Sequence, residues 1–351
     1  YEIFTGLVGS EMCIRDRYTI NHTINLSYRR KYMLKKLFIA LVFSSATFVW
    51  SGSSFADGHC QGSTMNDGQT GGKYPQQYEL SEYESAADCT MKFSDNPNIA
   101  SINATIQGNP GSLPPVEDRL PDEPLVVVPY ESIGKYGNTI NFLSNATEAG
   151  TSDMLSTRHV NLLRFADDLT TIVPNVAKDY EWNDDFTTLT FMLRKGHKWS
   201  NGEPFVARDV EFWYEDLMMN TNIREKPYPY LLVGGEAMTV DVIDDQTVRF
   251  NLPSPFPGLT ATIAWSYNQF FMPSHFLEQF HPEIDSNADA NAQALGFADG
   301  YDALAAYYGN SGWTDTPTPL LARPDLVAGL PYAAYPSLEA YMTIEDTTEG
   351  R

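Results

Sequence analysis

A polar loop after a predicted strand carries side chains suited to binding a small polar molecule. Residues 140–143 predict a core strand that runs directly into the loop 144–151. In this loop Asn145 and Thr147 offer hydrogen-bond donors and acceptors, and Glu148 offers a carboxylate that can pair with a ligand cation. Ligands of α/β proteins bind in crevices at strand ends. We therefore predict ligand contacts at these three residues, with an ordinary polar loop as the alternative.

An aromatic run at residues 265–271 offers a second surface for a ligand. Its indole and phenol rings can stack on flat or apolar parts of a bound molecule. We predict contacts from Trp265 and Tyr267, and we expect Phe270 and Phe271 to be less exposed. Packing inside the fold is the alternative for the whole run.

The sequence contains none of the common catalytic or metal-binding signatures. It has no His-Glu-x-x-His or Gly-x-Ser-x-Gly motif, and its histidines do not have metal-ligand spacing. Adjacent acids such as Asp167 and Asp168 suit turns, because neighbouring side chains on an extended chain point apart. Residues 285–291 resemble the start of a calcium loop, but Ala290 replaces the glycine that such a loop requires. We expect no catalytic residue, no metal site and no cofactor.

Residues 33–56 have the pattern of a secretory leader. Two lysines precede an apolar stretch at 37–49, and Ala56 ends a cleavage site of small residues. The apolar stretch is too short to span a bilayer, and a membrane anchor is the alternative. We predict cleavage after Ala56 and a periplasmic mature protein, with residues 1–32 as non-native upstream sequence.

Two cysteines, Cys60 and Cys89, lie close together in the segment that follows the leader. In an exported chain such a pair predicts a disulfide. A bridge closing a loop of this size would contribute ~3 kcal/mol in the chain-entropy model. Two free thiols are the alternative, and in either state the role of these residues is structural.

Residues 188–220 predict a strand followed by a helix. Leu189, Phe191 and Leu193 alternate with less apolar neighbours, which is the pattern of a half-buried strand. From residue 207 the period changes to that of a helix. The apolar face of this helix consists of Val210, Trp213, Tyr214 and Leu217.

Residues 160–165 predict another strand of the same small sheet. Residues 238–243 and 247–252 flank an Asp-Asp-Gln turn and predict a β-hairpin. Ser274 is placed to cap a helix that continues to Phe280.

Residues 193–210 contain, in order, Leu-Arg-x-Gly-x-Lys-Trp-Ser-Asn-Gly-x-Pro-Phe-x-Ala-x-Asp-Val. This block resembles the signature of the periplasmic solute-binding proteins that serve peptide-type ABC importers, and similar family context occurs at 172–177 and 272–275. One departure is Val206, which stands where the family usually has Thr or Ser as the helix N-cap. The absence of a capping Thr or Ser side chain at this position would cost ~1 kcal/mol of helix stability. We expect this signature block to be scaffold and not ligand site.

The resemblance implies an α/β fold: a periplasmic-binding-protein-like lobe with a mixed sheet and flanking helices, its second lobe missing or only begun. It also implies that the loop after residue 143 lines the ligand cleft. We divide the chain into upstream sequence (1–32), leader (33–56), N-terminal extension and linker (57–134), and a first lobe truncated at its C-terminus (135–351).

The predicted function is the capture of oligopeptide-like solutes by an exported, monomeric receptor that delivers them to an inner-membrane ABC permease. The alternatives are an oligosaccharide-binding member of the same family and a secreted carbohydrate-active enzyme. The net charge of −22 argues against nucleic acid as a partner, because like charges repel.

Overall fold

The computed structural model describes residues 60, 68, 71–101, 114–132, 134–136, 160–266 and 269–308. The chain separates into two units, residues 1–56 and 57–351, and every described residue belongs to the second. The predicted leader and the predicted strand at 140–143 lie outside the described residues. No helix within the described ranges has the length and apolar character needed to cross a membrane.

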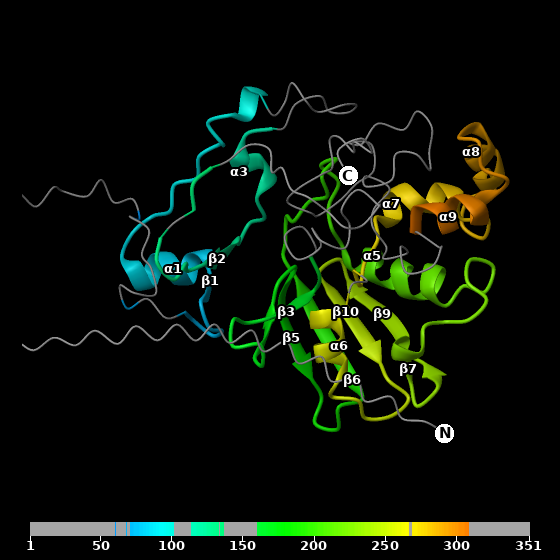
Figure 1. Ribbon diagram of the computed structural model, residues 1–351, viewed down its shortest axis with the longest axis horizontal. Helices are drawn as coiled ribbons and strands as arrows, with labels where there is room; N and C mark the ends of the chain where they lie inside the picture. The colour runs from blue at the N-terminus through cyan, green and yellow to red at the C-terminus, as the bar shows by residue number, and fades with distance from the viewer. Residues whose placement is uncertain are drawn as a thin grey trace, which may run out of the picture. The chain divides into compact units, whose positions relative to one another are not determined.

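The described residues of the predicted segment 57–134, here called the extension, form a small structure of their own. Its strands β1 and β2 pair antiparallel (Figure 1). Tyr78, Tyr83 and Val128 form its buried cluster, and a disulfide joins Cys60 to Cys89. The named elements of the extension are β1 (Gln77–Glu79), α1 (Leu80–Ala87), α3 (Val116–Arg119) and β2 (Leu125–Val127).

Residues 160–308, here called the scaffold, contain a four-stranded antiparallel sheet in the order β5-β6-β10-β9 (Figure 1). Its second strand contains the predicted alternation, which buries Leu189, Phe191 and Leu193 on one face. The last two strands form the predicted hairpin. The four strands are β5 (Ala177–Trp182), β6 (Thr188–Leu193), β9 (Thr239–Asp244) and β10 (Thr247–Asn251).

The prediction that residues 160–165 join this sheet is wrong. Instead β3 (Leu163–Phe165) pairs with β4 (Ile172–Pro174) in a separate two-stranded sheet. The turn between them is closed by Asp168, whose side chain accepts hydrogen bonds from the amides of Thr170 and Thr171. This turn favours pairing of β3 with the neighbouring β4 over pairing with the four-stranded sheet. Every described strand pair is antiparallel, and the expected mixed sheet is therefore not found in the described part of the chain.

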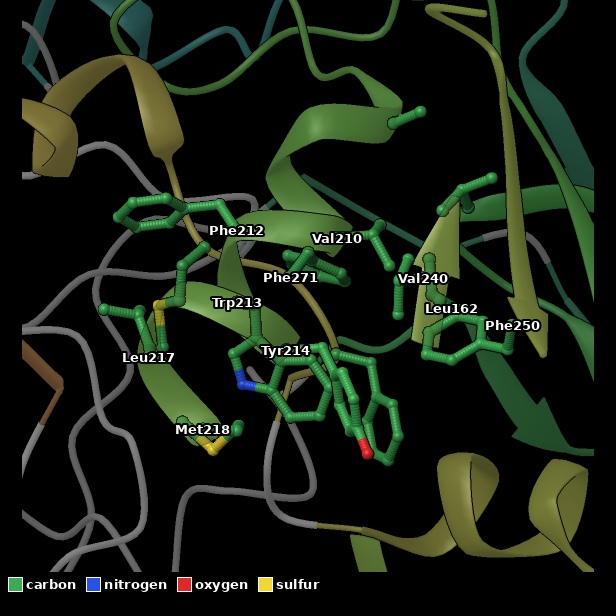
Figure 2. Packing of buried hydrophobic residues seen from close by; sticks show 14 of the residues in the cluster. Leu162, Val210, Phe212, Trp213, Tyr214, Leu217, Met218, Val240, Phe250 and Phe271 are labelled. Atoms are coloured by element: carbon green, nitrogen blue, oxygen red, sulfur yellow. The ribbon is translucent and has the colours of Figure 1, made fainter. Parts of the chain in front are cut away.

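The predicted helix begins at Ala207 but changes character after one turn. α5 (Ala207–Glu211) continues as the π-helix η2 (Phe212–Met218). The four residues of the predicted apolar face are all fully buried, and the wider π turn also buries Phe212 and Met218. Figure 2 shows these side chains in one cluster with Val240 and Phe250 of the sheet and with Phe271.

The remaining elements surround this core. The prediction that Ser274 caps a helix is wrong, because Pro273 occupies the N-cap and the Ser274 hydroxyl donates to Asp209. The elements are η3 (Pro229–Leu231), β7 (Leu232–Val233), β8 (Glu236–Ala237), α6 (Leu259–Trp265), α7 (Ser274–Leu277), η4 (Glu278–Phe280), α8 (Ala288–Ala294) and α9 (Gly300–Tyr308).

Candidate functional site

Trp265, the last residue of α6, presents its indole to the surface. It is 58% exposed, whereas Ile263 and Ser266 on either side are buried. Of the tryptophans in the described ranges, it alone is exposed. The other predicted ligand contacts, Asn145, Thr147, Glu148 and Tyr267, lie outside the described residues. A flat ring on a short helix is a ready stacking platform.

The segment that carries Trp265 is fastened at both ends by the side chain of Asn161. The Asn161 Nδ2 donates to the carbonyl of Ile263 at 2.9 Å, before the tryptophan. The amide of Phe270 donates to Asn161 Oδ1 at 3.1 Å, after it. Asn161 is only 3% exposed, and its carboxamide is satisfied by backbone partners. One buried side chain therefore joins the two ends of the segment 263–270.

Asp209, the acid of the signature block, organises the next part of the same segment. Its Oδ2 accepts from the indole Nε1 of Trp199 at 3.0 Å and from the amide of Val206 at 2.9 Å. Its Oδ1 accepts from the amide of Ser274 at 2.9 Å and from the Ser274 hydroxyl at 2.7 Å. Burial raises the pKa of Asp209, and these hydrogen bonds act in the opposite direction. The carboxyl thus ties the helix start to the residues that follow the aromatic run.

These contacts explain why the helix starts at Ala207 without a capping side chain at Val206. The Asp209 carboxylate reaches back to the Val206 amide, which is the N3 half of a capping box. Within the signature block, the Trp199 indole donates to Asp209, and Asp209 in turn accepts from Ser274. The sequence offered a signal for this, since an acid three residues after an expected N-cap predicts such a contact.

A cavity of about 570 Å³ lies between the extension and the scaffold. Pairs of opposite charge cross it or line it. Lys73 forms an ion pair with Asp179, and the hydroxyl of Tyr74 donates to the same carboxylate at 2.7 Å. The Arg194 Nη1 donates to Glu79 Oε2 at 2.7 Å and to the Glu123 carbonyl at 3.0 Å. The sequence did not predict this cavity, because its walls come from segments far apart in the chain.

The electrostatics of the cavity follow from these pairs. Burial and the hydrogen bond to Asp179 raise the pKa of the Tyr74 hydroxyl. Burial acts to raise the pKa of Asp179, but the hydrogen bonds from Lys73 and Tyr74 outweigh it and the pKa is lowered. Arg194 is 3% exposed, and its Nε and Nη2 have no hydrogen-bond partner among the described residues. The paired charges indicate that this cavity lies at the interface where the extension packs against the scaffold.

The described residues contain no group of three side chains arranged to hold a metal ion. In the acidic stretch that resembled a calcium loop, the Asp285 carboxylate accepts from the amide of Asn287 at 2.8 Å, just before α8. Its oxygens therefore serve the start of that helix.

Comparison with known proteins finds a family model that matches most of this scaffold. Residues 171–303 match the family model of bacterial extracellular solute-binding proteins, family 5, middle region. These residues are similar to the middle region of that family. The match covers the four-stranded sheet, the signature block and Trp265, and it ends within the first half of α9. Family 5 is a family of binding proteins and not of enzymes.

The individual proteins that this chain resembles carry different names. A periplasmic alpha-galactoside-binding protein of Rhizobium meliloti is 32% identical over 195 residues, covering 49% of this chain and 28% of the relative. The oligopeptide-binding protein OppA of Bacillus subtilis is 31% identical over 101 residues, covering 26% of this chain and 18% of the relative. A solved structure of an oligopeptide-binding protein OppA matches with a TM-score of 0.58 and 26% identity, over 77% of this chain and 39% of that chain. The chain thus spans well under half the length of these relatives.

Proposed function

We propose that the full-length protein is the exported solute-binding component of an ABC importer. It captures a small solute in the periplasm as a monomer and delivers it to an inner-membrane permease. The family match of residues 171–303 supports the binding role, and the leader pattern at 33–56 supports export. This proposal includes the predicted division of the chain into upstream sequence (1–32), leader (33–56), extension (57–134) and first lobe (135–351). A second lobe would close over the ligand by a hinge motion.

For the ligand, we propose an oligosaccharide with α-galactosyl units. The observation that carries this proposal is the exposed indole of Trp265 on a segment fastened by Asn161 and Asp209. Sugar rings present flat apolar faces, and such faces stack on aromatic side chains. The 32% identity to a relative named for alpha-galactosides supports the same ligand class.

An oligopeptide-like solute is the second candidate. It is favoured by the solved oligopeptide-binding structure with a TM-score of 0.58. In this case Glu148 would pair with a cationic group of the peptide, while Asn145 and Thr147 would hydrogen-bond to its backbone. Trp265 and Tyr267 would contact apolar side chains of the peptide.

The two candidates are separated by calorimetric titration of the full-length protein with raffinose and with a mixture of tripeptides. Saturable binding of raffinose without release of reducing sugar supports the first, and binding of peptides alone supports the second. Binding of neither by the folded full-length protein would contradict both, and release of reducing sugar would contradict a pure binding role.

The variant Trp265→Ala tests the stacking surface directly. We expect its dissociation constant for the ligand to rise about tenfold, because a stacked aromatic ring contributes on the order of 1 kcal/mol beyond its buried area. Phe186→Ala is the matched control, since Phe186 is an exposed aromatic residue in the turn before β6. An unchanged dissociation constant in a folded Trp265→Ala protein would remove Trp265 from the site.

A further inference from the structure

The exposed position of Trp265 depends on a few buried hydrogen bonds. Ile263, before the tryptophan, and Phe270, after it, are both completely buried. Between them, Trp265 lies at the surface. A segment of this kind can take several conformations unless its two ends are held at a fixed separation, because each free residue retains backbone entropy.

Asn161 supplies that fixed separation. Its Nδ2 binds the Ile263 carbonyl and its Oδ1 binds the Phe270 amide, so one rigid carboxamide spans the two ends. The same Oδ1 also accepts from the amide of Leu162, and the Asn161 backbone carbonyl accepts from the amide of Val176, just before β5. Asn161 is therefore itself held in place by the scaffold, so its side chain can fix the positions of Ile263 and Phe270.

Asp209 holds the chain immediately beyond this segment. Its backbone carbonyl accepts from the Met272 amide at 3.0 Å, and its carboxylate accepts two hydrogen bonds from Ser274. Because Asp209 also bonds to Trp199 and Val206, its removal would disturb the whole signature block. The side chain of Asn161 binds both ends of the tryptophan segment directly, so it is the residue through which the segment can be tested.

We propose that Asn161 is a positioning residue for the ligand surface at Trp265. It does not touch the ligand. It fixes the two ends of the segment 263–270, so that the indole occupies one orientation before the ligand arrives. This inference rests on the proposed function, since it assumes that Trp265 contacts the ligand. A side chain that fixes the binding orientation in advance strengthens affinity by reducing the ordering cost of binding.

The test uses full-length protein labelled with 5-fluorotryptophan, in which the Trp265 fluorine resonance is assigned by its loss in Trp265→Phe. In Asn161→Ala we expect this resonance to shift or broaden in the absence of ligand. We expect the dissociation constant for the ligand found by titration, raffinose or tripeptide, to rise about tenfold, and Asn161→Ala/Trp265→Ala to bind no more weakly than Trp265→Ala.

Val248→Ala is the matched control, because Val248 is fully buried in β10 and its truncation also lowers stability. A purely structural role for Asn161 predicts that both variants, at the same loss of melting temperature, leave the Trp265 resonance unchanged. That result would overturn the proposal. If Asn161→Ala does not fold, Asn161→Asp replaces it: this change keeps the bond to Phe270 and turns the bond to Ile263 into a repulsion, so the resonance should again move.

Failure of the proposed function gives a different pattern. If Trp265→Ala binds ligand as tightly as the wild type, the ligand surface lies elsewhere and the positioning proposal falls with it, whatever the resonance does. If Trp265→Ala weakens binding but Asn161→Ala changes neither the resonance nor the dissociation constant, the ligand surface stands and only the positioning role is overturned.

Discussion

The scaffold and the extension are stabilised in different ways. The scaffold buries a large apolar cluster that includes Trp213, Tyr214 and Phe250, with Trp213 packed against Phe270 at a ring separation of 4.4 Å. The described part of the extension buries only Tyr78, Tyr83 and Val128 in its own cluster. A cluster this small contributes little, since each buried large apolar side chain stabilises by ~1.5–3 kcal/mol. The disulfide supplies what the small core lacks.

Three basic residues of the signature block lie where the scaffold contacts the extension. The extension meets the scaffold through the turn that follows β6. Arg194 forms an ion pair with Glu79, and the Lys195 Nζ lies 3.6 Å from Asp122 Oδ2. The Lys198 Nζ donates to the Asp118 backbone carbonyl at 2.6 Å. The apolar residues of the block build the scaffold, and three of its basic residues, Arg194, Lys195 and Lys198, contact the extension. Polar docking of this kind is specific but contributes modest stability where the charges are exposed.

The largest expected effect comes from breaking the scaffold core. Trp213→Ala should lower the free energy of unfolding by about 4 kcal/mol, because it removes a fully buried indole and leaves a cavity. Urea unfolding of the purified protein measures this. Trp213→Phe should cost clearly less, since it keeps an aromatic ring and removes an indole N–H that has no partner among the described residues. A cost of Trp213→Ala below about 1 kcal/mol would contradict the core assignment.

The disulfide distinguishes the two regions more sharply. Its cysteines are 29 residues apart, and closing a loop of this length contributes about 3.5 kcal/mol in the chain-entropy model. In Cys60→Ser/Cys89→Ser, the amides of β1 and β2 should exchange hydrogen faster while those of β6 and β10 stay protected. Equal loss of protection in all four strands would show that the extension and scaffold unfold as one unit.

The smallest effect concerns pH. Burial, with a further contribution from Arg194, lowers the pKa of His197 from 6.5 to about 4. The unfolded chain then binds a proton at pH values where the folded protein does not. Stability from this group is complete above pH 6.5 and is lost as the pH falls toward 4, by an amount on the order of 2 kcal/mol.

His197→Phe isolates this contribution, because it keeps a ring against Phe205, whose centroid lies 5.5 Å from that of His197. Melting temperatures of the wild type and the variant should diverge between pH 6.5 and pH 4.5, with the variant losing less. Parallel pH profiles would show that the folded protein accepts the proton on His197 without cost.

Local pattern was enough where a single element decides its own structure. The alternation of Leu189, Phe191 and Leu193 predicted β6, and the turn between residues 243 and 247 predicted the hairpin. The apolar spacing predicted the buried face of the helix from Ala207, and the order of residues in the signature block predicted the family. The apolar spacing did not predict the π-helix. In the tertiary structure Phe212 is buried as well as Trp213, and this burial accompanies a departure from the regular helical period.

Pairings between distant segments were decided only by the tertiary structure. Residues 160–165 read as a strand of the main sheet, yet β3 pairs with β4 because a tight turn brings them together first. Asn161 has no sequence signal at all, since its partners at Ile263 and Phe270 lie about a hundred residues away. The predicted contacts at Asn145, Thr147, Glu148 and Tyr267 stay predictions.

By itself, the sequence determined the chemistry available to this protein: an aromatic run, a polar loop, a cysteine pair and a signature block that resembles a known family. The tertiary structure decided how that chemistry is used. It exposes Trp265 while burying Phe270 and Phe271, and it commits Asp209 and Asn161 to hydrogen bonds that hold the aromatic segment. The physical reason is that exposure and hydrogen-bond satisfaction depend on neighbours that sequence distance does not reveal.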